Sequence, residues 1–342
     1  MRRVPRRHPD CALIAGMIVR WGLDALPDVL EELSVGDPLL ISTERWRGTE
    51  LPVALRNRFY GVQPHAEVAG VEQARAAADG ADGLIALGGG SAIDTAKAVS
   101  SETGLPVVSI PTTYSGAEWT EGFGMRDPAA GIKRRGAGGR PVAIVYDHTL
   151  TLALPAAPTA GTSMNALAHC AEALYTAEPG GETDTHALQG AALISESLPA
   201  VMENPADEEA RRRLLQGAMH AGAALRGGMG LGHAMAQALG GRYGLQHGTM
   251  NAVTLPPALR YNRDVASEAI ARLGEAMNRE DDPIERVAEL ARLAGSPRLR
   301  DYNVPREDLK SLSVAVAERG PAKNNPRPAP PEAILTVLEE IW

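Results

Sequence analysis

The sequence predicts an α/β domain with a parallel sheet at residues 1–152, followed by an all-helical domain at residues 153–342. In the first part, short continuous apolar runs alternate with helical stretches, a pattern typical of parallel strands covered on both faces. In the second part, strand-like runs nearly vanish, and long stretches rich in Ala, Leu and Glu are separated by Gly and Pro. A chain of 342 residues is long enough for two such domains.

The first part contains five apolar runs short enough to be strands, with two helical stretches among them. The predicted strands are residues 11–19, 38–42, 83–87, 107–110 and 142–146, and the predicted helices are residues 68–78 and 92–102. The domain boundary is expected at 147–158, where the segment TLALPAAPTAGT is typical of a linker that runs into a helix.

The second part contains a series of helical stretches with turn residues between them. The predicted helices are residues 162–177, 185–202, 206–224, 234–239, 265–277, 283–293 and 331–341. We therefore expect this half of the protein to consist of packed helices without a sheet.

Composition excludes several classes of protein. The net charge of −8 argues against a nucleic-acid-binding protein, which would usually show a basic face. No run approaches the roughly 18 apolar residues of a membrane span, and the basic start MRRVPRRHPD is interpreted as a solvated tail. Cys11 and Cys170 lie far apart, which argues against a disulfide framework and a cysteine-based zinc site. Reduced thiols and a cytoplasmic location are expected.

The sharpest local signal is the segment LGGGSAIDTAK at residues 87–97. An apolar strand ends in three glycines, and a helix begins at Ser91. Glycines allow the backbone to approach a ligand closely, and the N–H groups at a helix start suit a pyrophosphate. The plainer alternative is a tight turn with Ser91 as the N-cap of the helix.

The ten-residue segment GGGSAIDTAK closely resembles the GGGSxxDxAK phosphate loop of the iron-containing alcohol dehydrogenase superfamily. The resemblance implies a Rossmann-like first domain in the dehydroquinate synthase-like fold of that superfamily, and a homodimer. It also implies that Gly88, Gly89, Gly90 and Ser91 hold the pyrophosphate of a nicotinamide cofactor, with Asp94 near the nicotinamide.

A second segment, IPTTYSGAEWT at residues 110–120, resembles the family segment PTTxxxGSExT. The resemblance implies that Thr112, Thr113 and Ser115 line the cofactor site, although Thr113 could instead serve simple turn chemistry. Thr43 stands where NAD-preferring relatives often carry an aspartate that binds the ribose 2′-OH. Since Arg45 follows closely, we expect both NADH and NADPH to be accepted.

The superfamily binds a divalent metal through an Asp, a His four residues later, and two more His separated by fourteen positions. This chain aligns as Asn165, His169, His233 and His247. If a metal such as Fe or Zn is present, these four residues are its expected ligands. A neutral amide is a poor ligand for a hard cation, so no metal is expected, and Asn165 could also be a helix-capping amide.

The segment MNALAHCAEALY, which contains Asn165, closely resembles the maleylacetate reductases, a branch that carries Asn at this position and is regarded as metal-independent. The resemblance covers nearly the whole chain and implies reduction of maleylacetate, or a related ring-cleavage product, to 3-oxoadipate. Gln237 departs from the wider superfamily, where a histidine often takes part in proton transfer. The expected partner is a small dicarboxylate or carbonyl substrate.

Reduction of such a substrate places negative charge on the ketone oxygen, which fixed hydrogen-bond donors must stabilise. His169, His233 and His247 are the expected donors, with Asn165 beside them. The substrate carboxylates need cationic or amide partners. The candidates for these contacts are Tyr114, Gln237, Arg242 and Arg327, with Lys133, Arg134, Arg135 and Arg140 in a glycine-rich loop at 126–140 that could act as a lid.

Three alternatives remain open from the sequence. The first is a metal-dependent alcohol or aldehyde dehydrogenase in which Asn165 contributes its carbonyl oxygen. The second is a lyase related to dehydroquinate synthase, against which the GGGS and PTT segments argue. The third is a catalytically inactive nucleotide-binding protein, against which the three spaced histidines argue. His186 and His220 are expected to be structural.

Overall fold

The protein is described from a computed structural model that covers residues 12–14, 16–127, 132–139, 141–176 and 180–342. These residues form two compact units. The first comprises the chain up to residue 112 together with 117–150, and the second comprises 113–116 together with 151–342. The predicted boundary at 152/153 lies close to the second division, whereas the sequence does not predict that residues 113–116 pack with the helical unit.

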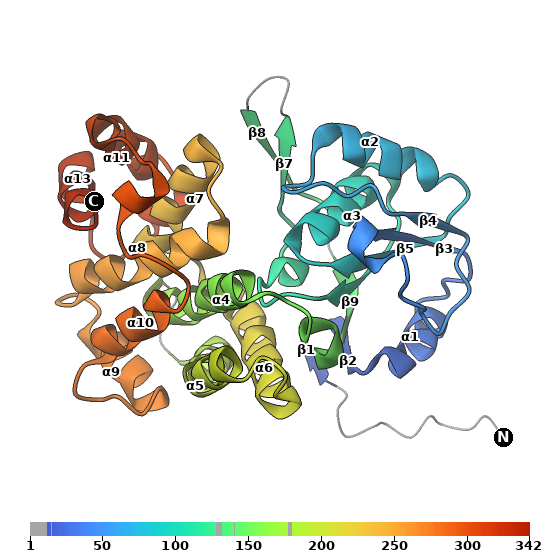
Figure 1. Ribbon diagram of the computed structural model, residues 1–342, viewed down its shortest axis with the longest axis horizontal. Coiled ribbons are helices and arrows are strands. Elements are labelled where there is room, and N and C mark those ends of the chain that lie inside the picture. The colour runs from blue at the N-terminus through green and yellow to red at the C-terminus, as the bar shows by residue number, and fades with distance from the viewer. Residues whose placement is uncertain (1–11, 15, 128–131, 140, 177–179) are drawn as a thin grey trace. The chain divides into compact units, whose positions relative to one another are not determined.

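In the described residues, the first unit is built on a seven-stranded sheet of order β1-β2-β9-β6-β5-β3-β4 (Figure 1). Its strands are β1 Ala12–Ile14, β2 Met17–Trp21, β3 Pro38–Ser42, β4 Asn57–Phe59, β5 Gly83–Gly88, β6 Val107–Pro111 and β9 Pro141–Tyr146. The β1–β2 pair is antiparallel and the other neighbours pair in parallel. The predicted parallel α/β class is confirmed.

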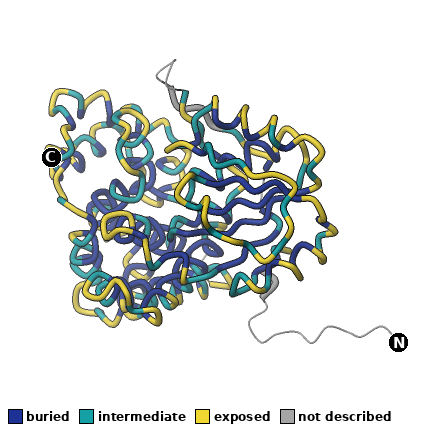
Figure 2. Tube along the Cα trace, turned by 45° about the vertical axis from the view of Figure 1, so that its right-hand side comes forward, coloured by how far each residue is buried: buried dark blue, intermediate teal, exposed yellow. Residues whose placement is uncertain are grey.

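The central strands are apolar throughout because both faces of the sheet are covered. Figure 2 shows these strands buried, and every residue of β3, β5 and β6 is buried. On one face, Leu39 and Ile41 pack with residues of α2 Val68–Ala77 and α3 Gly90–Thr103. On the other face, Leu40 packs with residues of α1 Leu26–Glu32. Alternate side chains therefore point to opposite cores, as expected for a parallel sheet.

Two predictions in the first unit were wrong. The run at 11–19 is not one strand, because Gly16 adopts φ +80° between β1 and β2 and turns the chain. The stretch at 126–140 is not a simple loop, because β7 Phe123–Asp127 pairs antiparallel with β8 Ile132–Gly136. The basic tail, Cys11 and Arg140 lie outside the described residues, and the side chains of residues 133–135 are not described.

The second unit is helical, as predicted. Its helices are α4 Ala156–Thr176, α5 Gly181–Glu203, α6 Glu208–Ala224, α7 Leu231–Tyr243, α8 His247–Asn262, α9 Ser267–Ala276, α10 Pro283–Arg292, α11 Leu309–Ala317, α12 Gly320–Lys323 and α13 Pro331–Glu340. Helices α8, α11 and α12 were not predicted. Pro256 and Pro257 lie inside α8, and proline normally signals a helix end. Nowhere in the described ranges is a helix both long and apolar enough to span a membrane.

Candidate active site

The glycine-rich loop of the first unit connects β5 to α3. Gly88 has φ +151°, and a Cβ atom there would lie 2.9 Å from the Cβ of Ala92, so the position requires glycine. The N-cap of α3 is Gly89, and among the described residues no side chain caps this helix. Ser91 is therefore not the N-cap; its hydroxyl accepts a hydrogen bond from His65 N at 2.9 Å. The partly exposed start of α3, at Gly89 and Gly90, leaves backbone N–H groups for an anion.

Lys97 fixes the chain around this loop. Its side chain is completely buried, and its Nζ atom lies 2.9 Å from Asp94 Oδ1. Nζ also donates to the carbonyl oxygens of Ala117 at 2.9 Å and Gly122 at 2.7 Å. The second carboxylate oxygen of Asp94 accepts from Gly124 N at 3.1 Å. Asp94, expected near the nicotinamide, thus also joins α3 to the start of β7.

Two further predicted cofactor residues lie at strand ends of the first unit. Thr112 is buried and follows β6, and its N–H donates to Gly88 O at 3.1 Å. Thr43 is partly exposed, follows β3 and forms an isolated bridge with Gly61. Both therefore lie at the carboxyl edge of the parallel strands, where ligands of α/β proteins bind.

The segment 113–116 belongs to the second unit. Thr113 Oγ1 lies 3.3 Å from Ser115 Oγ, and both residues are partly exposed. Tyr114 is completely buried, and its hydroxyl accepts from Arg211 Nη1 at 3.2 Å. The expected contact of the Tyr114 side chain with substrate is therefore wrong, because the ring is enclosed within the helical unit.

The structure brings the three spaced histidines together. His169 lies on α4, His233 in the first turn of α7, and His247 at the start of α8. The rings of His169 and His233 are stacked with centroids 4.8 Å apart, and those of His233 and His247 are 6.0 Å apart. The packing of these three helices thus brings together histidines that are far apart in the sequence.

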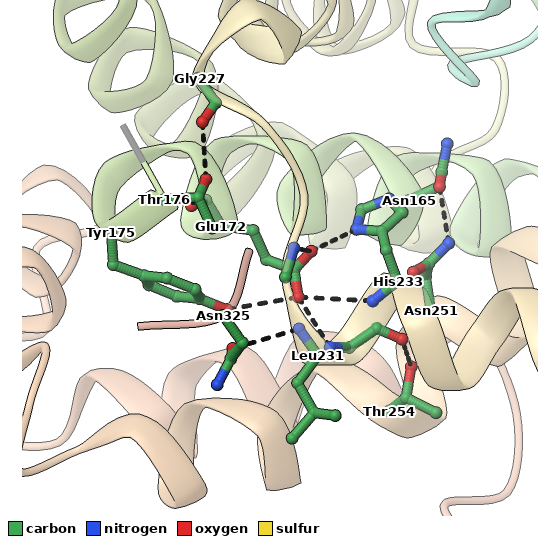
Figure 3. A network of polar contacts seen from close by, with 12 residues as sticks. Asn165, Glu172, Tyr175, Thr176, Gly227, Leu231, His233, Asn251, Thr254 and Asn325 are labelled. Carbon is green, nitrogen blue, oxygen red and sulfur yellow. Dashed lines mark hydrogen bonds and ion pairs between the residues drawn. The ribbon is translucent and has the colours of Figure 1, made fainter. Parts of the chain in front are cut away.

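Asn165 lies one turn before His169 on α4 and makes hydrogen bonds at both ends of its amide. Its Nδ2 donates to Ser115 O at 2.8 Å. Its Oδ1 accepts from Asn251 Nδ2 at 2.7 Å (Figure 3). Asn251 Nδ2 also lies 3.2 Å from His247 Nε2. Asn251 Nδ2 also donates to His247 O at 3.2 Å, so this amide joins Asn165 to the start of α8.

Glu172 is a site residue that the sequence analysis missed. Its buried carboxylate lies 2.6 Å from His233 Nδ1 and accepts from the N–H groups of Gly230 at 2.6 Å and Gly232 at 2.8 Å (Figure 3). It therefore both caps α7 and fixes the ring of His233. The available signal was its position three residues after His169 on the same helix, where side chains share a face.

Two histidine nitrogens remain available to a ligand. In the part of the chain that the structure describes, His169 Nδ1 and His233 Nε2 are buried without a hydrogen-bond partner, which is rare unless another group binds there. Burial, reinforced by His233 and His247, holds the pKa of His169 well below its usual value. His169 is therefore neutral at pH 7.

The other residues predicted to contact the substrate are Gln237, Arg242 and Arg327, and both arginines have partners within the protein. Gln237 lies one turn after His233 on α7 and is partly buried. Arg242 pairs with Asp308 at 2.9 Å and donates to Ser311 Oγ at 2.7 Å. Arg327 is exposed, stacks over Tyr261 and donates to its carbonyl oxygen at 2.9 Å. Each arginine thus already has partners within the protein, and these contacts leave some of its five N–H hydrogens for a carboxylate.

Comparison with known proteins places this arrangement in a family. Residues 24–148 match iron-containing alcohol dehydrogenase, and residues 159–342 match the C-terminal part of the Fe-containing alcohol dehydrogenase family. The chain belongs to the iron-containing alcohol dehydrogenase family. This confirms the predicted family and class of enzyme, an oxidoreductase.

The chain is also similar to individual relatives that are named as maleylacetate reductases. The family member described here is 36% identical to maleylacetate reductase from Burkholderia cepacia over 95% of each chain. It is 35% identical to maleylacetate reductase 1 from Cupriavidus pinatubonensis, over 92% of this chain and 91% of the relative. The solved maleylacetate reductase from Rhizobium sp. strain MTP-10005 has a TM-score of 0.85 at 29% identity, over 95% of each chain.

Proposed function

We propose that this enzyme reduces maleylacetate, or a closely related ring-cleavage product, to 3-oxoadipate with NADH or NADPH. The observation that carries the proposal is the amide of Asn165, which donates to Ser115 O and accepts from Asn251. An ionised aspartate could not make the first bond, because it has no hydrogen to donate. The amide suits a metal-independent site, and the relatives named maleylacetate reductase support the same substrate.

A nicotinamide dinucleotide fits the glycine loop of the first unit. A side chain at Gly88 would fill the space beside Ala92, and the uncapped start of α3 suits a pyrophosphate. Gly88, Gly89, Gly90 and Ser91 would hold that group, with Thr43, Asp94, Thr112, Thr113 and Ser115 as the other proposed cofactor residues. When bound, the reduced nicotinamide supplies the hydride.

The iron that the family name implies does not fit the donor set of the second unit. Asn165 offers no negative charge, and its carbonyl oxygen already accepts from Asn251. In the described chain, no group of three or more His, Cys, Asp or Glu side chains is arranged to hold a metal ion. We therefore derive no step through a metal.

The histidine cluster supplies what the reduction needs. Hydride adds to the alkene carbon remote from the ketone, charge moves to the ketone oxygen, and a proton then adds to the carbon between them. The unpartnered Nδ1 of His169 can face the ketone oxygen and carry the hydrogen of that ring. A ring N–H there would stabilise the developing charge in surroundings from which water is largely excluded. A neutral His233 donates from Nδ1 to Glu172, so its Nε2 is an acceptor.

A second candidate function is a metal-dependent alcohol or aldehyde dehydrogenase that uses Fe or Zn. The same two unpartnered nitrogens favour it, because neutral imidazole nitrogens are common ligands of both metals. In that case Asn165 would have to release Asn251 before its oxygen could bind the ion.

One experiment separates the two candidates: NADH oxidation with freshly prepared maleylacetate, before and after exhaustive EDTA treatment, with metal content measured in parallel. Fast oxidation by metal-free protein supports the proposed reductase. Inactivity towards maleylacetate, together with metal-restored activity towards simple alcohols or aldehydes, supports the second candidate and contradicts the first.

We also propose that the enzyme is a cytoplasmic homodimer. The family resemblance supports the dimer, and the free, buried thiol of Cys170 agrees with a reducing compartment. Sedimentation velocity of the purified protein tests the oligomeric state, and a monomer at micromolar concentration would contradict it.

A further inference from the structure

We propose that Arg211 is a positioning residue of the active site, which acts by anchoring the Tyr114 side chain and through it the segment 113–116. This inference rests on the proposed function, because it concerns how the histidine cluster is held for that reaction. Neither Arg211 nor Tyr114 needs to touch the substrate for the inference to hold.

Arg211 is an unusual side chain for its location. It lies on α6 and is only 1% exposed, and in the described residues no carboxylate forms an ion pair with it. Its guanidinium instead donates to neutral acceptors at 3.1–3.4 Å, which are Pro205 O, Tyr114 OH, Thr159 Oγ1 and Leu154 O. A buried arginine that joins separate chain segments in this way fixes their relative positions.

Tyr114 is the link between Arg211 and the segment 113–116. The ring is completely buried, and the hydroxyl receives one of the guanidinium hydrogens. Its backbone N–H donates to Thr162 Oγ1 at 3.3 Å. The residue is thus held at both its side chain and its backbone by helices of the second unit, although residues on either side of the segment belong to the first unit.

The anchored segment contacts two candidate catalytic residues. The carbonyl oxygen of Ser115 accepts from Asn165 Nδ2 at 2.8 Å. The Asn165 amide in turn accepts from Asn251, whose Nδ2 lies 3.2 Å from His247 Nε2. Gly116, at φ +75°, lies beside His169, and a Cβ atom there would be in ordinary van der Waals contact with its Cε1 and Nδ1 atoms, at 3.5 Å. A shift of the segment would therefore move the Asn165 amide and open space beside the unpartnered Nδ1 of His169.

The minimal test is Tyr114→Phe, which removes only the hydroxyl and keeps the buried ring. The matched control is Thr159→Val, which removes another acceptor of the same guanidinium but does not belong to the segment. We expect Tyr114→Phe to lower kcat for maleylacetate on the order of tenfold, since small misplacements of reacting groups are costly. KM for NADH should also rise, because Thr113 and Ser115 of the same segment are proposed cofactor residues, whereas Thr159→Val should keep both kcat and KM for NADH within about twofold of the wild-type values.

A second readout does not depend on the substrate. In nitrogen-15-labelled protein, the ring resonances of His169 should shift in Tyr114→Phe and remain in place in Thr159→Val. The same kcat in both variants, with His169 resonances at the wild-type positions, would overturn the inference and leave Arg211 a purely structural residue. If wild-type protein does not reduce maleylacetate, the proposed function fails, while the resonances of His169 still decide the positioning role.

Discussion

The carboxylate of Glu172 lies 2.6 Å from Nδ1 of His233, and both side chains are completely buried. The same carboxylate accepts from the first N–H groups around α7, so that one side chain fixes both the start of the helix and the ring that it carries. Since His233 Nδ1 faces Glu172, its Nε2 is the nitrogen left for a ligand. The orientation of the His233 ring thus depends on Glu172.

Glu172→Gln should therefore impair both stability and turnover. The amide would place N–H hydrogens against backbone N–H donors or against His233, and leaving such buried donors unsatisfied costs on the order of 1–3 kcal/mol. We expect that loss in urea unfolding and a fall in kcat of at least about tenfold. The control is Glu196→Gln, which breaks an exposed ion pair with Arg213 and should cost less than about 1 kcal/mol. Equal stability of the two variants would contradict the role of Glu172.

Asn165→Asp should shift the site towards metal binding. The carboxylate cannot donate to Ser115 O, which lies 2.8 Å from the present Nδ2, so the two oxygens would repel each other. It does provide the hard anionic ligand that the amide lacks. We expect lower metal-free turnover of maleylacetate and a higher bound Fe or Zn content by elemental analysis. Unchanged metal content and unchanged turnover would show that the amide has no special role.

Gly88→Ala should weaken cofactor binding. At φ +151° and with the Cβ of Ala92 only 2.9 Å from the new methyl group, the loop must shift, at a cost of about 1–3 kcal/mol. The matched control is Gly104→Ala, which also has a positive φ of +74° but open space around it. Fluorescence titration with NADH should show weaker binding in Gly88→Ala and wild-type affinity in Gly104→Ala. Weakening of equal size in both variants would contradict a specific role of the loop.

The sequence predicts the parts of this protein that depend on local pattern. Strands such as 38–42 and 83–87 are readable because both sheet faces are buried, which makes every position apolar. The proximity of Asn165 and His169 can be predicted because residues four apart share one helix face. A local pattern does not show which helices pack against each other. The role of Glu172 depends on such packing, because its carboxylate on α4 contacts His233 on α7.

Tyr114 illustrates the opposite error. A tyrosine beside predicted cofactor residues suggests a ligand contact, yet its ring is completely buried and its hydroxyl accepts from Arg211, which lies 97 positions later in the chain. The charges of Arg242 and Arg327 likewise suggest a carboxylate contact, whereas their contacts with Asp308 and Tyr261 depend on tertiary structure. Helix α8 escaped prediction because packing tolerates Pro256 and Pro257 inside it, against their local preference.

His247→Ala should lower turnover strongly while leaving NADH affinity nearly unchanged. His247 belongs to the cluster through Asn251, at 3.2 Å, and through the ring of His233, whereas the glycine loop is formed entirely by the first unit. We expect a fall in kcat of about a hundredfold, in the range of a lost group that stabilises developing charge. Stopped-flow kinetics with NADH and maleylacetate measures both quantities, and wild-type turnover would remove His247 from the site.

The pair of His186 and His220 should make the protein less stable in acid. Their Nδ1 atoms lie 2.8 Å apart, and burial, followed by the proximity of His186, lowers the pKa of His220 to about 4 from 6.5. A histidine with a lowered pKa stabilises the folded state fully above its unfolded pKa, and that contribution is lost as the pH falls from 6.5 to 4. At about 1.4 kcal/mol per pKa unit, the loss is on the order of 3 kcal/mol. Urea unfolding across this range should therefore show a shallower decline for His220→Gln than for the wild type, while the two profiles run parallel from pH 7 to 8. Parallel profiles down to pH 4 would contradict the assignment.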